Sequence, residues 1–506
     1  MKKIIFILTL FATQAVAQNQ NNVWMFGDSA GIDFNSITNP IPITSGVIGR
    51  GSCVSLADSN GNLILYAATM PYFGPYTFLA TKLFNDQNLI LPGADSITGE
   101  AWYNELGLFP KPGDTTGNLY YVFSIGVNGA PNPGLYFTLI DMSLNGGLGG
   151  VMQENIQLDT IEYGDCLTTI KHGNGRDWWV IAKINNFPFT FLNRFRVYLV
   201  TPDSINGPFI QDFNDASDVS FQKIIWHPEY AKFMLINTRG YMSEFNFDRC
   251  SGLISLDQNI YPEITNFNRP FWGGAYSPNG NIFYTSRTSY GGNGGDYNYL
   301  LQYDLTAANI PLSCDTLDST LYPIADCGDL RLAPDGKIYY TQAYPHGFPY
   351  QDTMRNYVNE NLGVINNPDV VGTGCNFQPF SFYLGGKRTY YGLPNNPNYS
   401  LGPIVASLCD TLSTVINEVK EKSATIYISP NPATRLIYFN AQHLKGKQGI
   451  LNIVTINGER VFQKPIEILN GGYATLRIEI SSYPSGIYFV SFQTEKESVA
   501  GKFVKE

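Results

Sequence analysis

The sequence is poor in charged residues and in histidine. Asp, Glu, Lys and Arg make up 15% of the 506 residues, and none of the four histidines stands in an H-x-x-H or H-E-x-x-H arrangement. This spacing argues against a His-built metal site, and we expect neither a metal nor a cofactor. The net charge is −10, with no clustered basic stretch, which excludes the footprint of a nucleic-acid-binding protein. The hydrophobic fraction of 44% is too high for a disordered chain.

Long apolar runs are missing after the N-terminus. The chain begins with Met1-Lys2-Lys3, continues with the nine residues Ile4–Ala12 and reaches Ala15-Val16-Ala17. A basic start, a short apolar stretch and an A-x-A ending predict a secretory signal peptide over residues 1–17, cut between Ala17 and Gln18. The apolar stretch is too short for a transmembrane anchor, which needs about 20 residues. The sequence therefore predicts an exported protein without a transmembrane segment.

The seven cysteines contain no C-x-x-C pair, and their odd number leaves at least one unpaired. Export permits disulfides, so buried single thiols and one or two bridges both stay open. The first candidate pair is Cys314 with Cys327, which would close a short loop.

Charge is distributed unevenly along the chain. From residue 424 onward there are nine Lys and Arg against six Glu, with no Asp and no Cys, whereas the part between the signal peptide and residue 417 carries a net −15. This break in composition predicts a large acidic body over 18–412, a linker over 413–424 and a small C-terminal domain over 425–506.

A polar turn followed by an aliphatic and aromatic strand recurs along the body. The turns are centred on positions 61, 117, 175, 231, 280, 336 and 386, which lie 49 to 58 residues apart. Asn-Gly and Asp-Gly pairs supply the positive φ angles that tight hairpins need. Strand-rich repeats of this length are typical of propeller blades, so the sequence predicts an all-β fold with a β-propeller of about seven blades. Six or eight blades stay open, because the copies at 231 and 386 are weak, and a β-sandwich built of hairpins is the alternative fold.

To close the ring, residues 23–34 should pack against 375–395, which removes exposed sheet edges.

Several motifs imitate catalytic or ligand-binding sites. Gly27-Asp28-Ser29-Ala30-Gly31 matches G-x-S-x-G and resembles the first block of lipases with a Gly-Asp-Ser motif, but no helix pattern follows it, and no histidine has an Asp three residues before it. Asp58-x-Asn60-x-Asn62 starts like a calcium loop without the later bidentate Glu. We therefore predict turns at both places. Gly291–Gly295 lacks the Lys-Ser/Thr of a phosphate-binding loop, and His172 and His227 are expected to hydrogen-bond locally. No catalytic residue is assigned.

The body is similar to a family of secreted proteins of the Bacteroidetes phylum that carry an N-terminal propeller-like region. The resemblance covers nearly all of residues 22–412 and implies a fold class but no activity. The matching segments are residues 24–34, 247–252, 301–305, 332–339, 364–369 and 392–395.

The C-terminal 80 or so residues carry a more specific pattern. Strands with a two-residue period are predicted over 451–456, 474–480 and 487–493, as in a small all-β unit. The pattern resembles the type A C-terminal sorting domain of the type IX secretion system, although an ordinary adhesive β-sandwich module is the alternative. The motif residues are Pro430, Asn431, Pro432, Asn457, Gly458, Pro484, Gly486, Tyr488 and Lys502. The resemblance implies Sec export to the periplasm, then passage through the outer membrane by the type IX machinery. It also implies removal of the domain, and either surface anchoring or release.

Two classes of function follow. The leading one is a non-enzymatic surface or secreted module that binds a polysaccharide or a protein. The alternative is a secreted propeller hydrolase or lyase acting on an extracellular polymer, which needs acid and base groups within reach of one site. Several carboxylates and a His lining one pocket would indicate an enzyme, whereas an aromatic-lined rim would indicate binding. Aromatic residues make up 14% of the chain, but strands favour them for packing.

Overall fold

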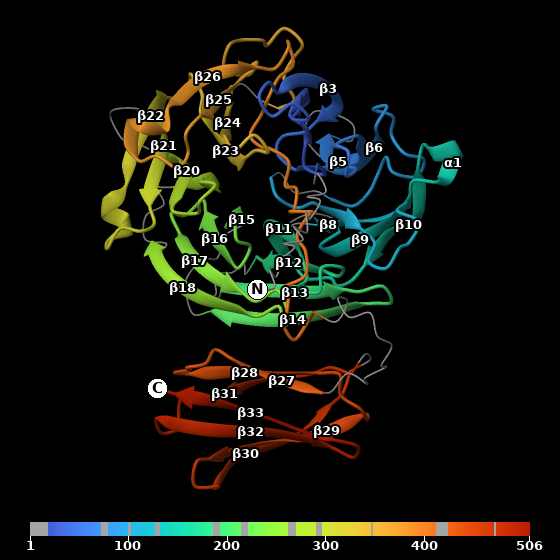
Figure 1. Ribbon diagram of the computed structural model, residues 1–506, viewed down its shortest axis with the longest axis vertical. Coiled ribbons are helices and arrows are strands. Elements are labelled where there is room, and N and C mark those ends of the chain that lie inside the picture. Colours follow the sequence, from blue (N-terminus) through green and yellow to red (C-terminus); the bar gives the residue numbers. More distant parts are fainter. Residues whose placement is uncertain are drawn as a thin grey trace, which may run out of the picture.

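The body is a ring of antiparallel sheets around a central channel, as Figure 1 shows. The computed structural model describes residues 19–71, 79–99, 103–126, 132–185, 193–213, 221–261, 270–289, 296–345, 348–410, 424–469 and 472–506. Within these residues the body forms seven sheets, which confirms the predicted propeller and its approximate blade number.

Each sheet is built from consecutive strands, which begin at the channel and proceed outward in most sheets. The first two sheets have three strands each, namely β1 (Val23–Phe26), β2 (Asp28–Asp33) and β3 (Ile41–Ile48), and then β4 (Cys53–Ala57), β5 (Leu63–Pro71) and β6 (Leu79–Asn85). The third and fourth sheets contain β7 (Gly107–Pro110), β8 (Leu119–Gly126), β9 (Gly134–Asp141) and β10 (Gly150–Gln157), and β11 (Tyr163–Lys171), β12 (Trp178–Ile184), β13 (Asn193–Val200) and β14 (Ile205–Phe213). The fifth and sixth contain β15 (Gln222–Trp226), β16 (Lys232–Asn237), β17 (Met242–Phe247) and β18 (Ile254–Tyr261), and β19 (Phe271–Tyr276), β20 (Ile282–Ser289), β21 (Tyr297–Asp304) and β22 (Asp315–Leu321). The seventh contains β23 (Asp326–Leu332), β24 (Ile338–Ala343), β25 (Asn361–Ile365) and β26 (Phe377–Tyr383).

Helical structure in the described body is limited to short turns. These are α1 (Leu144–Gly147) and the 3-10 turns η1 (Ile310–Ser313) and η2 (Gly372–Cys375). Among the residues that the structure describes, no helix has the length and apolar character needed to cross a bilayer.

Six of the seven predicted turns join the first strand of a sheet to its second. At position 61, for example, Gly61 has a φ of +88°, and the Asp58 carboxylate accepts the backbone N–H groups of Asn60 and Asn62 at 2.8 and 2.9 Å. The calcium-like spacing is therefore an Asp-capped hairpin turn. Its side-chain acceptor satisfies the N–H groups that the tight turn leaves without sheet partners.

The seventh predicted turn does not begin a hairpin. Gly385 and Gly386 follow the outermost strand β26, and residues 389–391 leave the sheet and enter the channel. The sheet that this copy was expected to begin is supplied instead by the N-terminal strands β1–β3, the first sheet. The repeat spacing wrongly predicted a hairpin at position 386. A seven-sheet ring can be completed by strands from either end of the chain, and here the N-terminal end supplies them.

Ring closure occurs between the predicted segments. The backbone N–H of Asp28 donates to the Arg388 carbonyl at 2.7 Å, the N–H of Arg388 donates to the Asp28 carbonyl at 3.2 Å, and their side chains form an ion pair. The core is continuous across this junction, because Phe34 packs edge-on against both Trp24 and Tyr339 with ring centroids 4.8 and 5.4 Å apart. Aromatic side chains thus pack the first sheet onto the last.

Residues 388–409, which we call the channel segment, pass through the middle of the ring (Figure 1). At one end the Tyr391 carbonyl accepts from the Asp329 N–H at 2.7 Å, and at the other end the Ile404 N–H donates to the Gly173 carbonyl at 2.8 Å. Between them, a Cβ at Gly392 would lie 2.1 Å from the Gly51 carbonyl oxygen. Only glycine fits there, because the backbone of the channel segment touches the channel wall.

A disulfide fixes the end of the channel segment. Cys409 is bonded to Cys250, 159 residues away in the sequence. The prediction of a Cys314–Cys327 bridge is wrong, because Cys327 is buried inside its sheet and both thiols are free. The short sequence separation that suggested this pair does not predict the pairing, because the fold brings cysteines together that are distant in the sequence.

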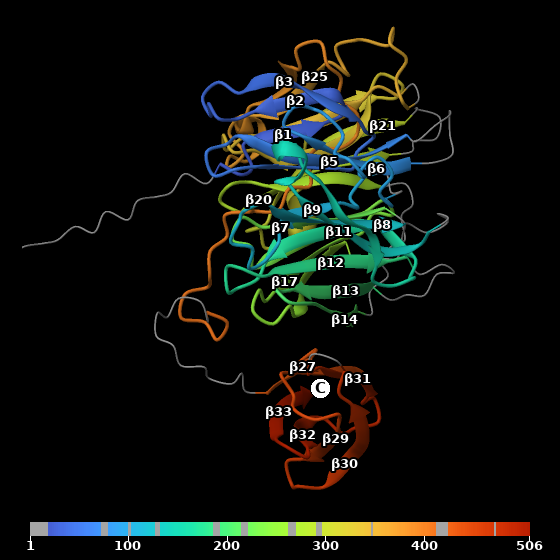
Figure 2. The same ribbon diagram turned by 90° about the vertical axis from the view of Figure 1, so that its right-hand side faces the viewer.

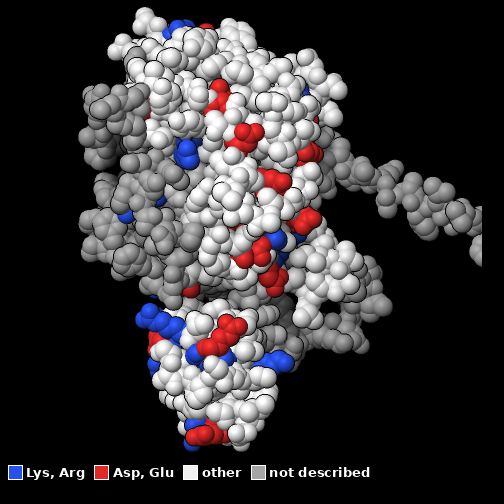
Figure 3. Space-filling view, turned by 90° about the vertical axis from the view of Figure 1, so that its left-hand side faces the viewer, with Lys and Arg blue, Asp and Glu red and all other residues white. Residues whose placement is uncertain are grey.

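The C-terminal domain consists of two sheets that enclose one core (Figure 2). The first holds β27 (Thr425–Ser429), β28 (Leu436–Gln442) and β31 (Ala474–Glu479), and the second holds β29 (Gln448–Thr455), β30 (Arg460–Glu467), β32 (Gly486–Thr494) and β33 (Ser498–Lys505). The three predicted strands are confirmed by β29, β31 and β32. In the view of Figure 3, acidic side chains are prominent on the body, and basic ones stand out on the C-terminal domain.

Candidate functional site

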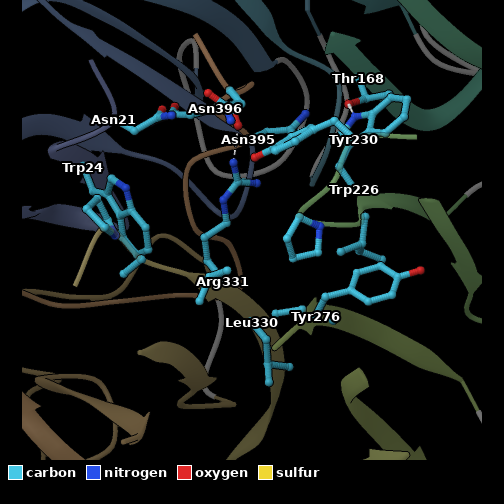
Figure 4. Close-up of a pocket in the computed structure, with 18 of the residues that line it drawn as sticks. Asn21, Trp24, Thr168, Trp226, Tyr230, Tyr276, Leu330, Arg331, Asn395 and Asn396 are labelled. Carbon is cyan, nitrogen blue, oxygen red and sulfur yellow. Dashed lines mark hydrogen bonds between the residues drawn. The ribbon is translucent and has the colours of Figure 1, made fainter. Parts of the chain in front are cut away.

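A cavity of about 420 Å³ lies beside the channel segment, where three neighbouring inner strands end (Figure 4). Its walls come from the C-terminal ends of β15, β19 and β23, from residues 19–24 and from the channel segment. The channel segment hydrogen-bonds to the second and fourth sheets through Asn395 and Asn396, which leaves space on the side of the fifth to seventh sheets. The volume falls within the range of small-ligand pockets.

Two of the aromatic side chains in the lining are half-buried and available to a ligand. Trp226, the last residue of β15, donates its indole N–H to Thr168 Oγ1 at 2.9 Å, which fixes the plane of the ring. Tyr230 follows in the β15–β16 turn at a φ of +55°. Trp24 and Tyr276 also line the cavity but are only 2% exposed, and the Tyr276 hydroxyl donates a hydrogen bond to Glu244 Oε1 at 2.8 Å. The rigid part of the wall is therefore Trp226 with Tyr230.

Asparagines supply most of the polar lining. Asn19, Asn21, Asn22, Asn395, Asn396 and Asn398 all contribute. Several are engaged in holding the channel segment: Asn21 Nδ2 donates to the Pro397 carbonyl at 3.1 Å, and Asn396 Oδ1 accepts from the Ser55 N–H at 2.8 Å. The Oδ1 atom of Asn21, in contrast, is buried and has no hydrogen-bond partner in the described structure. A buried acceptor without a partner is costly to the folded state.

The charged groups among the described lining residues are the two cations Lys223 and Arg331. Lys223 forms a buried ion pair with Asp329, which stands behind the wall. Burial lowers the pKa of Lys223, and the Asp329 carboxylate opposes that shift. Arg331 donates to the Asn396 carbonyl oxygen, as the dashed line in Figure 4 shows. Among the residues that the structure describes, no Asp, Glu or His lines this cavity.

The structure places the motifs that imitate active sites elsewhere. Ser29 lies in β2, directly after the turn at Gly27, at a φ of +64°, with its hydroxyl 3.5 Å from the Asp28 carboxylate. His172 and His227 hydrogen-bond within their own loops or to a neighbouring loop, since their Nδ1 atoms accept from the N–H groups of Asn174 and Glu229. Gly291–Gly295 falls outside the described residues. Within the described ranges no three metal-ligating side chains gather.

The cavity residues were not identified from the sequence. Arg331 stands between Leu330 and Leu332 before the Asp335-Gly336 turn, and Trp226 ends another strand before a turn. The available signal in the sequence was that both residues stand at or near the end of the first strand of a repeat. It could not be used, because the repeats do not show which of several strand ends face the same side of the channel segment.

One buried carboxyl group in the channel wall has a protonation state that affects stability. Glu105 is fully buried, accepts a hydrogen bond from Thr69, and has its pKa raised well above the ordinary value of 4.5 by burial and by the Asp165 carboxylate. Above pH 4.5 the unfolded chain loses this proton while the folded chain keeps it. The folded state therefore loses stability as the pH rises towards the folded-state pKa.

Replacing Glu105 with Gln should remove this loss. Glu105→Gln is expected to unfold at a higher urea concentration than the unaltered chain at pH 8, with a difference that shrinks towards pH 5. Urea unfolding at several pH values measures it, and Glu459→Gln, at an exposed turn, is the control that should show no trend. A difference that is independent of pH would contradict the assignment.

The predicted motif residues of the C-terminal domain have structural positions. Asn431 holds the first loop to the last strand, because its Oδ1 accepts from the Val504 N–H at 2.8 Å and its Nδ2 donates to the Lys502 carbonyl at 3.3 Å. The Tyr488 hydroxyl donates to the Pro484 carbonyl at 2.8 Å, and Gly458 makes the β29–β30 turn at a φ of +82°. Pro430 directly follows β27, Pro432 lies in the loop before β28, and Gly486 begins β32. The predicted cleavage site, Ala17 and Gln18, and the linker over 413–423 lie outside the described residues, so both stay predictions.

A comparison with protein families decides what this domain is. Residues 425–506 match the family model of the secretion system C-terminal sorting domain. The tail is a type IX sorting domain. This sorting domain implies an interaction with the type IX machinery and export to the cell surface or the medium. No curated protein matches the chain.

Solved structures resemble the chain only distantly. A protein from Lactobacillus plantarum is 9% identical, with 74% of this chain and 97% of that one covered, at a TM-score of 0.42. A β-propeller domain from Myceliophteria thermophila is 10% identical (75% and 96% covered, TM-score 0.29). A puromycin-hydrolyzing peptidase from Mycobacterium tuberculosis is also 10% identical (84% and 59% covered, TM-score 0.33). At these scores no activity transfers to this chain.

Proposed function

We propose that the body is an extracellular binding module that takes a polysaccharide into the cavity at the end of the channel. The observation that carries the proposal is the pairing of a fixed, half-buried Trp226 and Tyr230 with a wall of amide groups. A sugar presents apolar C–H faces and many hydroxyls. Aromatic rings pack against the C–H faces, and amide groups can both donate hydrogen bonds to the hydroxyls and accept hydrogen bonds from them. The sorting domain delivers the body to the compartment where such polymers occur.

The competing function is a hydrolase or lyase that acts on an extracellular polymer. Hydrolysis requires an acid and a base that exchange protons within one site. The described part of the lining contains two cations, of which one is already paired with Asp329, and it contains no carboxylate or imidazole. We therefore favour binding at this site, and a hydrolytic function would need another one.

A glycan array with the full chain identifies the ligand, and Trp226→Ala then tests the site. Loss of the ring is expected to weaken binding of a retained glycan by about 30-fold, in the range of a buried aromatic hot spot. The matched control is Trp272→Ala. Trp272 is also half-buried and donates to a threonine, Thr288 Oγ1, at 3.0 Å, but it lies at the opposite end of its inner strand.

Binding by Trp272→Ala should stay within about twofold of the unaltered chain, because the change is remote from the cavity. The melting temperature of both variants shows whether either one unfolds. A larger loss in Trp272→Ala than in Trp226→Ala would move the site to the other end of the channel, and an array that retains no glycan would overturn the polysaccharide proposal.

A further inference from the structure

The charges at the cavity do not balance. Two cations, Lys223 and Arg331, contribute to the lining, and one carboxylate, Asp329, lies behind them. Asp329 forms an ion pair with Lys223. Its oxygens also accept hydrogen bonds from the backbone N–H groups of Leu330 at 2.8 Å and Leu393 at 3.5 Å. One positive charge therefore remains in the wall of the cavity.

Arg331 carries that remaining charge, and its guanidinium is only partly used. It makes one hydrogen bond in the described structure, to the neutral main-chain oxygen of Asn396. A guanidinium has five N–H donors and stays protonated in proteins. Figure 4 shows its planar group held between Asn396 and Tyr230 and reaching into the cavity. Burial lowers the pKa of Arg331 and the Asp329 carboxylate opposes that shift, but the same carboxylate is paired with Lys223. An anion beside the guanidinium would therefore supply negative charge that the wall lacks.

The surrounding groups fit a ligand that also has hydroxyls. The lining asparagines carry amide groups that can hydrogen-bond to hydroxyls, and the indole ring of Trp226 is an apolar surface. Tyr230 stays neutral, because burial raises the pKa of its hydroxyl, so no second negative charge opposes an anion.

We propose that the cavity selects an acidic saccharide, with the carboxylate of a uronic acid unit bound by the Arg331 guanidinium. A carboxylate matches the fork of N–H donors in the plane of the guanidinium. The net −15 of the body does not prevent this, because salt screens charges beyond about 8 Å, whereas contact with Arg331 is direct. This inference rests on the proposed function.

The test compares one polymer in charged and neutral forms. Isothermal titration of the full chain uses an oligogalacturonate and its fully methyl-esterified form, which lacks the negative charges and carries one added methyl group on each acid unit. The charged form is expected to bind about tenfold more tightly. The third arm of the experiment is an oligosaccharide of neutral sugars that carries sulfate esters. It shows whether the cavity prefers a sulfate ester or a carboxylate as its anion.

The variant Arg331→Gln keeps a donor for Asn396 and removes the charge. It should bind the charged and neutral forms equally, while Arg460→Gln, at an exposed strand end in the sorting domain, should keep the preference. Tighter binding of the sulfated arm than of the uronate would overturn the carboxylate assignment. Equal binding of the charged and esterified forms by the unaltered chain would overturn the inference and leave polysaccharide binding intact. Binding of neither form, together with an empty glycan array, would overturn the proposed function itself.

Discussion

Deleting residues 425–506 is expected to abolish the appearance of the body outside the cell. These residues match the sorting domain, and their two sheets form a core of their own, so the deletion removes the signal without cutting a sheet of the body. The body should then accumulate in the periplasm. Fractionation of the native host, followed by immunoblotting with an antibody against the body, measures the distribution.

The control for the deletion is the full chain carrying Trp226→Ala, which alters the body and leaves the sorting domain intact. This variant should reach the cell surface or the medium in normal amounts. Body protein that still reaches the surface without residues 425–506 would show that another segment directs its export.

Removing the disulfide between Cys250 and Cys409 should have the largest effect on stability. The bond closes a loop of 159 residues in the unfolded chain, and the loss of chain entropy corresponds to about 5 kcal/mol in the entropic model. The double substitution Cys250→Ser and Cys409→Ser is therefore expected to lower the free energy of unfolding by about 3–5 kcal/mol. Urea unfolding of the oxidised chain measures this difference.

Cys314→Ser is the matched control, since Cys314 is half-buried and free. It should change the free energy of unfolding by about 1 kcal/mol at most, as a single surface-side substitution does. Alkylation of the unfolded, unreduced chain should label five cysteines. Equal stability of the double variant and the unaltered chain, or the labelling of seven cysteines, would contradict the observed pairing.

The disulfide is also linked to the site. Arg249, the neighbour of Cys250, donates to the Gly402 carbonyl at 2.9 Å, so the end of the channel segment is held by a covalent bond and by hydrogen bonds. That segment supplies Asn395, Asn396 and Asn398 to the cavity. Loss of the disulfide should therefore loosen one wall of the cavity as well as lower stability.

Local chemistry made much of the fold predictable. Turn residues such as Gly61 and Gly336 mark where the chain must adopt a positive φ, and this need depends only on neighbouring residues. The same holds for the hairpin at Asn457-Gly458. The weak copy at position 386 led to an error, because its glycines mark the departure of the chain from a sheet rather than a hairpin.

The sequence by itself determined the repeat of strands and turns, the acidic body with its basic tail and the identity of the sorting domain, because each depends on residues close together in the chain. Tertiary structure alone decided that β1–β3 form a sheet of their own, which cysteines pair and which side chains meet at the cavity. Trp226, Arg331 and Asn396 come from three separate parts of the chain. They meet because the channel segment fills only one side of the channel, and no local pattern records on which side it lies.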